Sequence, residues 1–128
     1  MKEKKIIITS TDSRYYHLVK ELLSSIKFNN LDDNFDFGIL DTGLTKEQKN
    51  QLSTENVLIK SAEWNVNVPK YKIRGRNHLK NIVARAFLPD YFQGYHKYIW
   101  LDADTWINHK DTFLLFDKGC EQNNICIT

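Results

Sequence analysis

Apolar residues recur along this chain with two different spacings, which together predict strands alternating with helices. Residues 5–10 contain the β-branched run Ile6-Ile7-Ile8-Thr9, which is typical of a buried strand. Thr11-Asp12-Ser13, which follows, has the chemistry of a helix N-cap. The next apolar residues lie three or four positions apart and predict one face of a helix of about four turns. They are Tyr15, Leu18, Val19, Leu22, Leu23 and Ile26.

The middle of the chain continues this alternation. A second strand is predicted over residues 35–40, and the turn-forming residues Asp41-Thr42-Gly43 close it. Thr45 and Gln48 have the spacing of a capping box. We therefore expect a short helix that begins after Thr45 and runs through Leu52.

A third short strand is predicted over residues 57–59, after which the periodicity fades over residues 61–76 and a loop is expected. Helical spacing returns over residues 77–88, and Pro89 should end or bend that helix. The strand predicted over residues 97–101 ends in four bulky apolar residues. Such a run indicates a strand that is buried on both faces inside a parallel sheet.

The end of the chain adds an apolar turn or helix at residues 113–116 and a further strand over residues 124–128. Strands and helices that alternate in this way predict an α/β fold, in which a mostly parallel sheet carries helices on both faces. Residues 1–128 are expected to form a single domain. The apolar ending predicts either a strand that closes the sheet or a chain shortened from something longer.

Composition narrows the class of protein. The hydrophobic content of 41% and charged content of 27% are ordinary for a soluble globular domain. A formal net charge of +2 gives no reason to expect a nucleic-acid partner. Cys120 and Cys126 are too few for a disulfide framework, which predicts reduced thiols and a cytoplasmic location, with peripheral membrane association left open. No apolar run approaches the length of a membrane span or a signal peptide.

Two acids directly follow the strand over residues 97–101. Asp102 and Asp104 would stand at the carboxyl edge of the sheet, where ligands of open α/β sheets collect. Two carboxylates so close together need a nearby positive charge, and a divalent cation would supply it. Carboxylate oxygens suit Mg²⁺ or Mn²⁺, whose shell is often completed by substrate phosphates. The alternative is a polar turn that simply ends the strand.

Basic residues provide a second kind of candidate. Arg85 lies on the predicted helix ahead of this strand and would point to the carboxyl edge, with a structural salt bridge as the competing role. Between positions 70 and 80 basic residues alternate, which in an extended segment would place them on one side to clamp a diphosphate. The alternative is a solvated loop. The alternating residues are Lys70, Lys72, Arg74, Arg76, His78 and Lys80.

The first strand ends in polar residues that suit a base and ribose better than a pyrophosphate, because no glycine-rich phosphate loop is present. Plain helix capping is the alternative. These residues are Thr9, Ser10, Thr11, Asp12 and Tyr15. The four histidines are scattered, and only His109 is near enough to the acids to be a candidate ligand, against the alternative of a surface residue.

Four segments in order resemble the GT-A glycosyltransferases of family 8, which include glycogenin and bacterial lipopolysaccharide galactosyltransferases. The segments are residues 8–26, 37–44, 84–89 and 98–105. The resemblance covers nearly the whole chain. It implies a GT-A fold and transfer of a sugar from a nucleotide-sugar of the UDP-sugar type, with the anomeric configuration retained.

The resemblance also implies roles for individual residues. Tyr15 would stack on uracil, Arg85 would reach the sugar diphosphate, and Asp102 with Asp104 would hold Mn²⁺ or Mg²⁺ against both phosphates, with Ala103 beside them in the donor site. The uridine would be contacted by Thr9, Ser10, Thr11 and Asp12. The family's domain is longer, and its second half carries the acceptor site and a metal-binding histidine. This chain therefore resembles a donor-binding half, and its acceptor (a glycan, lipid or protein) is unknown.

Two other functions are compatible with these sequence features. A non-catalytic remnant of the same fold would bind a nucleotide weakly or not at all. The sequence Asp102-Ala103-Asp104-Thr105 also fits the motif of haloacid-dehalogenase-like phosphatases, in which the first aspartate is a nucleophile. In that family the motif lies on an early strand, and only 24 residues follow Asp104 here, so the transferase interpretation is favoured.

Overall fold

The computed structural model describes residues 2–121 and contains one sheet of four parallel strands. The strands lie in the order β3-β2-β1-β4, so that β1 has a neighbour on each side. The predicted α/β class with a parallel sheet is therefore confirmed. The strands are β1 (Lys5–Thr11), β2 (Asp36–Asp41), β3 (Val57–Ser61) and β4 (Lys97–Trp100).

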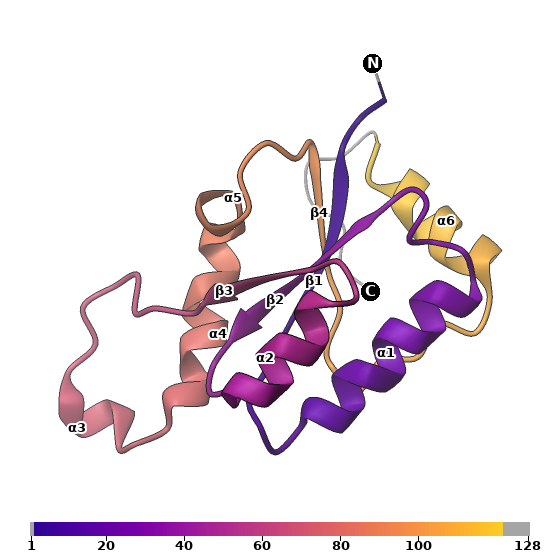
Figure 1. The fold of residues 1–128 in the computed structure, drawn as a ribbon. Coiled ribbons are helices and arrows are strands. Elements are labelled where there is room, and N and C mark those ends of the chain that lie inside the picture. Colours follow the sequence, from indigo (N-terminus) through magenta and orange to yellow (C-terminus); the bar gives the residue numbers. More distant parts are fainter. Residues whose placement is uncertain (1, 122–128) are drawn as a thin grey trace.

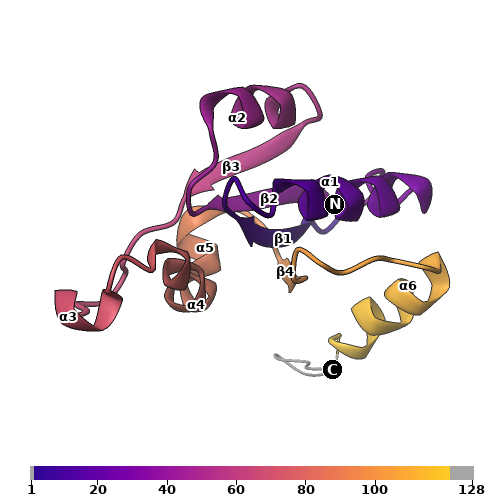
Figure 2. The same ribbon diagram turned by 90° about the horizontal axis from the view of Figure 1, so that it is seen from below.

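Helices cover both faces of the sheet, as predicted. Figure 1 shows α4 and α5 on one side and α1 and α6 on the other, and Figure 2 shows the same separation from below. No helix within residues 2–121 combines the length and the apolar composition needed to cross a bilayer. The helices are α1 (Tyr16–Phe28), α2 (Lys46–Ser53), α3 (Lys70–Ile73), η1 (Asn77–Leu79), α4 (Lys80–Ala84), η2 (Arg85–Phe87), α5 (Leu88–Tyr91) and α6 (Lys110–Gly119).

The β-branched run of β1 explains why both faces must be covered. Successive side chains of a strand point to opposite faces. Ile7 packs in the cluster that includes residues of α1 and α6, whereas Ile6 and Ile8 pack with residues of α4 and α5. All three are completely buried, and each contributes roughly 1.5–3 kcal/mol of burial free energy.

The two predicted helix caps have different outcomes. The capping box at α2 is confirmed, because the Gln48 N–H donates to Thr45 Oγ1 (3.2 Å) and the Thr45 N–H donates to Gln48 Oε1 (3.0 Å). The N-cap predicted at Thr11-Asp12-Ser13 is wrong in position, because Tyr15 is the N-cap residue of α1 and its side chain makes no capping bond. The carboxylate of Asp12 instead closes the turn that precedes the helix.

The helix predicted over residues 77–88 is divided into η1, α4, η2 and α5. Proline explains the break at its end, because it has no N–H and its ring clashes with the carbonyl four residues earlier, which here belongs to Arg85. The chain responds with a turn of 3-10 helix at 85–87, after which Pro89 occupies the first turn of α5. Pro89 thus starts a new short helix instead of ending one.

Strand β4 differs from its prediction. It pairs only with β1 among residues 2–121, so it lies at an edge of the described sheet, and Ile99 alone is buried in it. The half-buried aromatic residues around Ile99 reach polar partners: Tyr98 Oη donates to the Phe92 carbonyl (2.8 Å), and the Trp100 indole donates to Asp102. Tyr and Trp are suited to a half-exposed edge strand, because each combines a large apolar ring with a hydrogen-bonding group.

Three further segments were predicted from the sequence: residues 61–76, 113–116 and 124–128. The apolar segment at residues 113–116 lies within helix α6, which confirms the helical alternative. The loop expected over residues 61–76 contains the short helix α3. The strand expected over residues 124–128 lies outside the described residues.

Candidate functional site

Strands β1 and β4 bring two distant parts of the sequence together at the carboxyl edge of the sheet. Ile8 pairs with Trp100, and the Leu101 N–H donates to the Ile8 carbonyl (3.0 Å), which extends the pairing one residue beyond β4. The chain then leaves the sheet at Asp102, beside the end of β1. The first and fourth strands are therefore neighbours, so residues that follow both of them can belong to one site.

The carboxylate of Asp102 is oriented by two side chains. Trp100 Nε1 donates to Asp102 Oδ1 (2.9 Å), and Arg85 Nη2 lies 3.5 Å from the same oxygen. The Arg85 guanidinium also stacks on the Trp100 ring, 4.1 Å from its centroid. The Asp102 side chain is 68% exposed, so the ion pair itself contributes little to stability. Trp100 and Arg85 mainly fix the direction of an accessible carboxylate.

Asp104 completes an exposed acidic turn. The Thr105 N–H donates to the Asp102 carbonyl (3.0 Å), which closes the turn, and both acids are exposed. His109 is exposed at the N-cap of α6. Within residues 2–121 no three acidic, cysteine or histidine side chains gather into a metal site, so His109 does not complete one with the acids. Two carboxylates without a third protein ligand fit Mg²⁺ or Mn²⁺ when the phosphates of a ligand supply further oxygens.

The residues at the end of β1 are divided between the two faces of the sheet. Thr9 shares the face of Ile7, is completely buried, and its hydroxyl has no hydrogen-bond partner. Thr11 is also buried, and its hydroxyl donates to the Asp12 carbonyl (3.0 Å). Because both side chains are buried, a nucleotide could meet these two residues only through their backbone, and the contact that the resemblance implies stays a prediction.

Ser10, Asp12 and Tyr15 remain accessible at the same edge. Ser10 faces the opposite side from Thr9 and accepts a hydrogen bond from Asn81 Nδ2 (2.7 Å). Asp12 Oδ1 accepts the N–H groups of Arg14 (2.9 Å) and Tyr15 (3.3 Å), so Asp12 closes the turn ahead of α1 and is not the N-cap residue that the alternative of helix capping expected. Tyr15 is 53% exposed, and the Arg14 guanidinium lies over its ring, 5.7 Å from the centroid.

A buried acid at the end of β2 supports this turn. Burial alone would raise the pKa of the Asp41 carboxyl, but the N–H groups of Leu44 and Gly43 and the Lys49 ammonium together hold that pKa below its usual range. Asp41 is therefore ionised and fixes residues 42–44. Gly43, which adopts a φ of +147°, then accepts the Ser13 N–H (3.0 Å) on its carbonyl.

The alternating basic residues do not form the predicted row. Residues Lys70–Ile73 form helix α3, and Arg74 adopts a left-handed conformation, so the segment is not extended. Figures 1 and 2 show α3 away from the sheet. Arg74 and Arg76 donate to backbone carbonyls of Tyr71, Ile73 and Lys72. The prediction failed because a period of two places side chains on one side only in a strand.

Sequence reasoning missed two residues of this edge. Asn81 connects α4 to Ser10, and Trp100 supplies both the ring under Arg85 and the donor to Asp102. Asn81 stands four residues before Arg85, a spacing that places both on one side of a helix, and this signal could have found it. No pattern in the sequence pointed to Trp100 as a site residue, because a large apolar residue at that position is expected in any buried strand.

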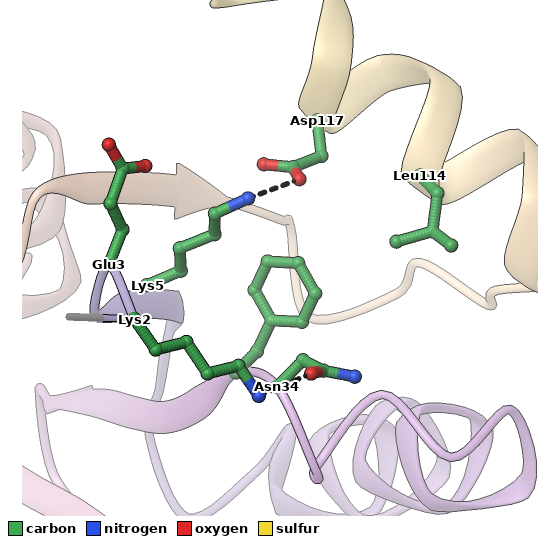
Figure 3. Close-up of a pocket in the computed structure, with 7 residues that line it drawn as sticks. Lys2, Glu3, Lys5, Asn34, Leu114 and Asp117 are labelled. Atoms are coloured by element: carbon green, nitrogen blue, oxygen red, sulfur yellow. Dashed lines mark hydrogen bonds and ion pairs between the residues drawn. The ribbon is translucent and has the colours of Figure 1, made fainter.

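A separate pocket of about 420 Å³ lies at the amino edge of the sheet. Figure 3 shows Lys5 of β1 and Asp117 of α6 facing each other across it. Asp117 binds Lys5 (2.7 Å) and Lys97 of β4 (2.8 Å), and its side chain is only 5% exposed. This buried charge cluster joins α6 to two strands at the edge opposite to Asp102.

Comparisons with solved structures show a shared fold. A galactosyltransferase, LgtC, in complex with donor and acceptor sugar analogs superposes with a TM-score of 0.61 and 19% identity, over 85% of this chain and 41% of that one. An active-site mutant of LgtC gives 0.63 and 19%, over 88% and 41%. The apo form of WbbM, a bifunctional glycosyltransferase, gives 0.60 and 19%, over 90% and 21%. This chain therefore spans less than half the length of each of these proteins.

Comparison with curated proteins found no match. The model of the family described as glycosyl transferase family 8, in contrast, matches residues 6–125, which is nearly the whole chain. The match includes β1, the turn that follows it, Arg85 and both acids after β4. Taken with the shared fold, this match shows that the chain belongs to glycosyl transferase family 8.

Proposed function

We propose that this chain is the donor-binding part of a glycosyltransferase, and that Asp102 and Asp104 hold Mn²⁺ or Mg²⁺ against the diphosphate of a nucleotide-sugar. One observation carries the proposal: two exposed carboxylates leave the sheet beside the end of β1, and Trp100 with Arg85 orients the first of them. A buried acid pair would have to neutralise itself, whereas an exposed and oriented pair can accept a cation.

The accessible residues of the β1–α1 turn supply the nucleoside side of the proposed site. The ring of Tyr15 offers a stacking surface for a base, and Ser10 with Asp12 offers oxygen atoms to a ribose. Arg85 lies beside the acids, because its guanidinium contacts Asp102, and α4, which directly precedes the 3-10 helix that carries Arg85, is joined to Ser10 through Asn81. That position suits a contact with phosphate oxygens, for which a guanidinium has the right geometry.

Each group has a distinct part in the proposed reaction. When bound, the metal ion acts as a Lewis acid that stabilises charge on the departing diphosphate. Asp102 and Asp104 hold the cation at the sheet edge, and Arg85 adds positive charge next to the leaving phosphates. Tyr15 fixes the far end of the donor, so that the sugar is presented in one orientation. This chain spans 41% of LgtC and 21% of WbbM, so the proposal covers donor binding and assigns no acceptor to these residues.

The decisive experiment is calorimetric titration of UDP into the chain with Mn²⁺ or with EDTA. We expect binding in Mn²⁺ and much weaker binding in EDTA, because two carboxylates and a diphosphate share the cation. Uridine, which lacks phosphates, serves as the control and should bind equally in both buffers. Equal affinity for UDP in Mn²⁺ and EDTA would contradict the proposal, and so would the absence of any binding.

Replacement of Tyr15 by alanine tests the nucleoside side. Stacking of a base on an aromatic ring contributes about 1–3 kcal/mol, so the affinity for UDP in Mn²⁺ should fall roughly 5- to 150-fold. Tyr15→Phe keeps the ring and should bind as wild type does. Tyr71→Ala is the matched control, because Tyr71 is also exposed but lies on α3. The role of Tyr15 is refuted if Tyr15→Ala and Tyr71→Ala bind UDP equally well.

A further inference from the structure

Both backbone polar groups of Ile107 are bound by side chains of the distant helix α1 and its C-cap. The Ile107 N–H donates to Ser25 Oγ (3.2 Å), and Asn29 Nδ2 donates to the Ile107 carbonyl (2.8 Å). Ser25 is completely buried and Asn29 is 9% exposed. Ile107 itself is buried in the same cluster as residues of α1. The chain after the acids is therefore attached to α1 by two shielded hydrogen bonds.

These bonds define the far end of the acidic turn. At its near end, the Leu101 N–H is bound to the Ile8 carbonyl on β1 (3.0 Å). Residues 102–106, which contain both acids, thus span two fixed points, one on the sheet and one on α1. The hydrogen bond from the Thr105 N–H to the Asp102 carbonyl further restricts the backbone between these two points. A short segment held at both ends loses little conformational freedom when it binds a ligand.

The two polar side chains have few other reasons to be buried. A buried hydroxyl or amide costs free energy unless it is hydrogen-bonded, and an apolar residue would pack against the core at no such cost. Ser25 Oγ also donates to the Leu22 carbonyl, and Asn29 Nδ2 also donates to the Ser25 carbonyl, so within α1 they bond only to carbonyls of their own helix. Among residues 2–121, Ile107 is the one hydrogen-bond partner that each of them has outside α1 and its C-cap.

We propose that Ser25 and Asn29 are positioning residues that hold Asp102 and Asp104 in place for the cation and the diphosphate. This inference rests on the proposed function, since it assigns these residues to the same site. Neither touches the ligand. They act through Ile107, by keeping the acidic turn at a fixed distance from the end of β1.

The test is Ser25→Ala, with Ser24→Ala as the matched control. Ser24 is the neighbouring serine, is exposed, and bonds only to the Lys20 carbonyl of its own helix. Ser25→Ala leaves the Ile107 N–H without its acceptor. Amide hydrogen exchange at Ile107 should become at least about tenfold faster, and the affinity for UDP in Mn²⁺ should fall about tenfold, while Ser24→Ala changes neither. Asn29→Leu, which keeps the branched shape of the side chain, removes the bond to the Ile107 carbonyl and should lower the affinity for UDP in the same way.

Two further outcomes separate this inference from the function on which it rests. Affinity is measured at a temperature where urea unfolding shows each variant to be fully folded, so that a loss of stability alone cannot change it. Faster exchange at Ile107 with wild-type affinity would overturn the positioning role and leave the proposed function intact. Failure of the wild-type chain to bind UDP would overturn the proposed function, and this inference with it.

Discussion

Replacing Asp102 and Asp104 together by asparagine is expected to abolish the gain in UDP affinity that Mn²⁺ provides, a loss on the order of 100-fold or more when two charged ligands are removed. Asparagine keeps an oxygen that can accept the Trp100 indole N–H, so the turn should retain its shape. The free energy of unfolding should therefore stay within about 0.5 kcal/mol of wild type, as is usual for exposed positions. Calorimetry and urea unfolding measure the two quantities.

The matched control for this variant is Asp32→Asn combined with Asp33→Asn. These two acids are also exposed and close in sequence, but they lie in the turn after α1. The net charge changes by the same amount in both double variants. A similar loss of affinity in the control would mean that overall charge, and not ligation at the carboxyl edge, governs binding. Unchanged affinity in the Asp102 and Asp104 variant would refute the metal site directly.

The second large effect is expected at the opposite edge of the sheet. Asp117→Asn removes the charge that pairs with Lys5 and Lys97, and leaves two partly buried ammonium groups together. Breaking a buried ion pair costs about 3–5 kcal/mol, and we expect the lower end because both lysines keep some contact with water. Urea unfolding measures the loss. Asp111→Asn, an exposed acid on the same helix, is the control and should cost less than about 1 kcal/mol.

A rescue variant makes this prediction sharper. Asp117→Leu with Lys5→Met and Lys97→Met replaces the whole cluster by apolar residues, which often restores stability where breaking one partner does not. The triple variant should therefore be more stable than Asp117→Asn. If it is less stable, the cost lies in packing at this edge and not in the unpaired charges. UDP affinity should be unaffected in any of these variants that remains folded.

The contribution of Asp117 should also depend on pH. Burial by itself would raise the pKa of this carboxyl, but Lys5 and Lys97 together hold the pKa below its usual range. Because the pKa is lower in the folded than in the unfolded chain, the stabilisation is fully present above the ordinary aspartate pKa of about 3.9 and is lost as the pH falls through the folded-state value. The difference in stability between wild type and Asp117→Asn should thus shrink below about pH 4.

Much of the fold could be predicted from the sequence, because local patterns agree with the final packing. The Ile6-Ile7-Ile8 run defines a strand buried on both faces, and Thr45 with Gln48 marks the start of α2. The edge position of β4 could not be predicted, because aromatic residues such as Tyr98 and Trp100 suit both a buried strand and a half-exposed one with polar partners. Order within a sheet depends on pairing across the chain, which composition does not encode.

The candidate site was predicted in part. The position of Asp102 after a strand placed it at the carboxyl edge, and Arg85 does lie beside it. Thr9 shows where such reasoning stops: Thr9 and Ser10 point to opposite faces of β1, both faces carry helices, and only the three-dimensional packing shows that Thr9 is fully buried while Ser10 reaches Asn81. Ser25 and Asn29 gave no signal at all, because their partner Ile107 is far away in sequence.

The separation of Asp117 from Asp102 by the full length of the central strands has an evolutionary consequence. The residues that hold this protein together and the residues proposed to meet its ligand can mutate independently of one another. A descendant could lose both acids at positions 102 and 104 and still fold normally. Under the proposed function, donor binding in such relatives should therefore be judged from those two positions and not from the fold.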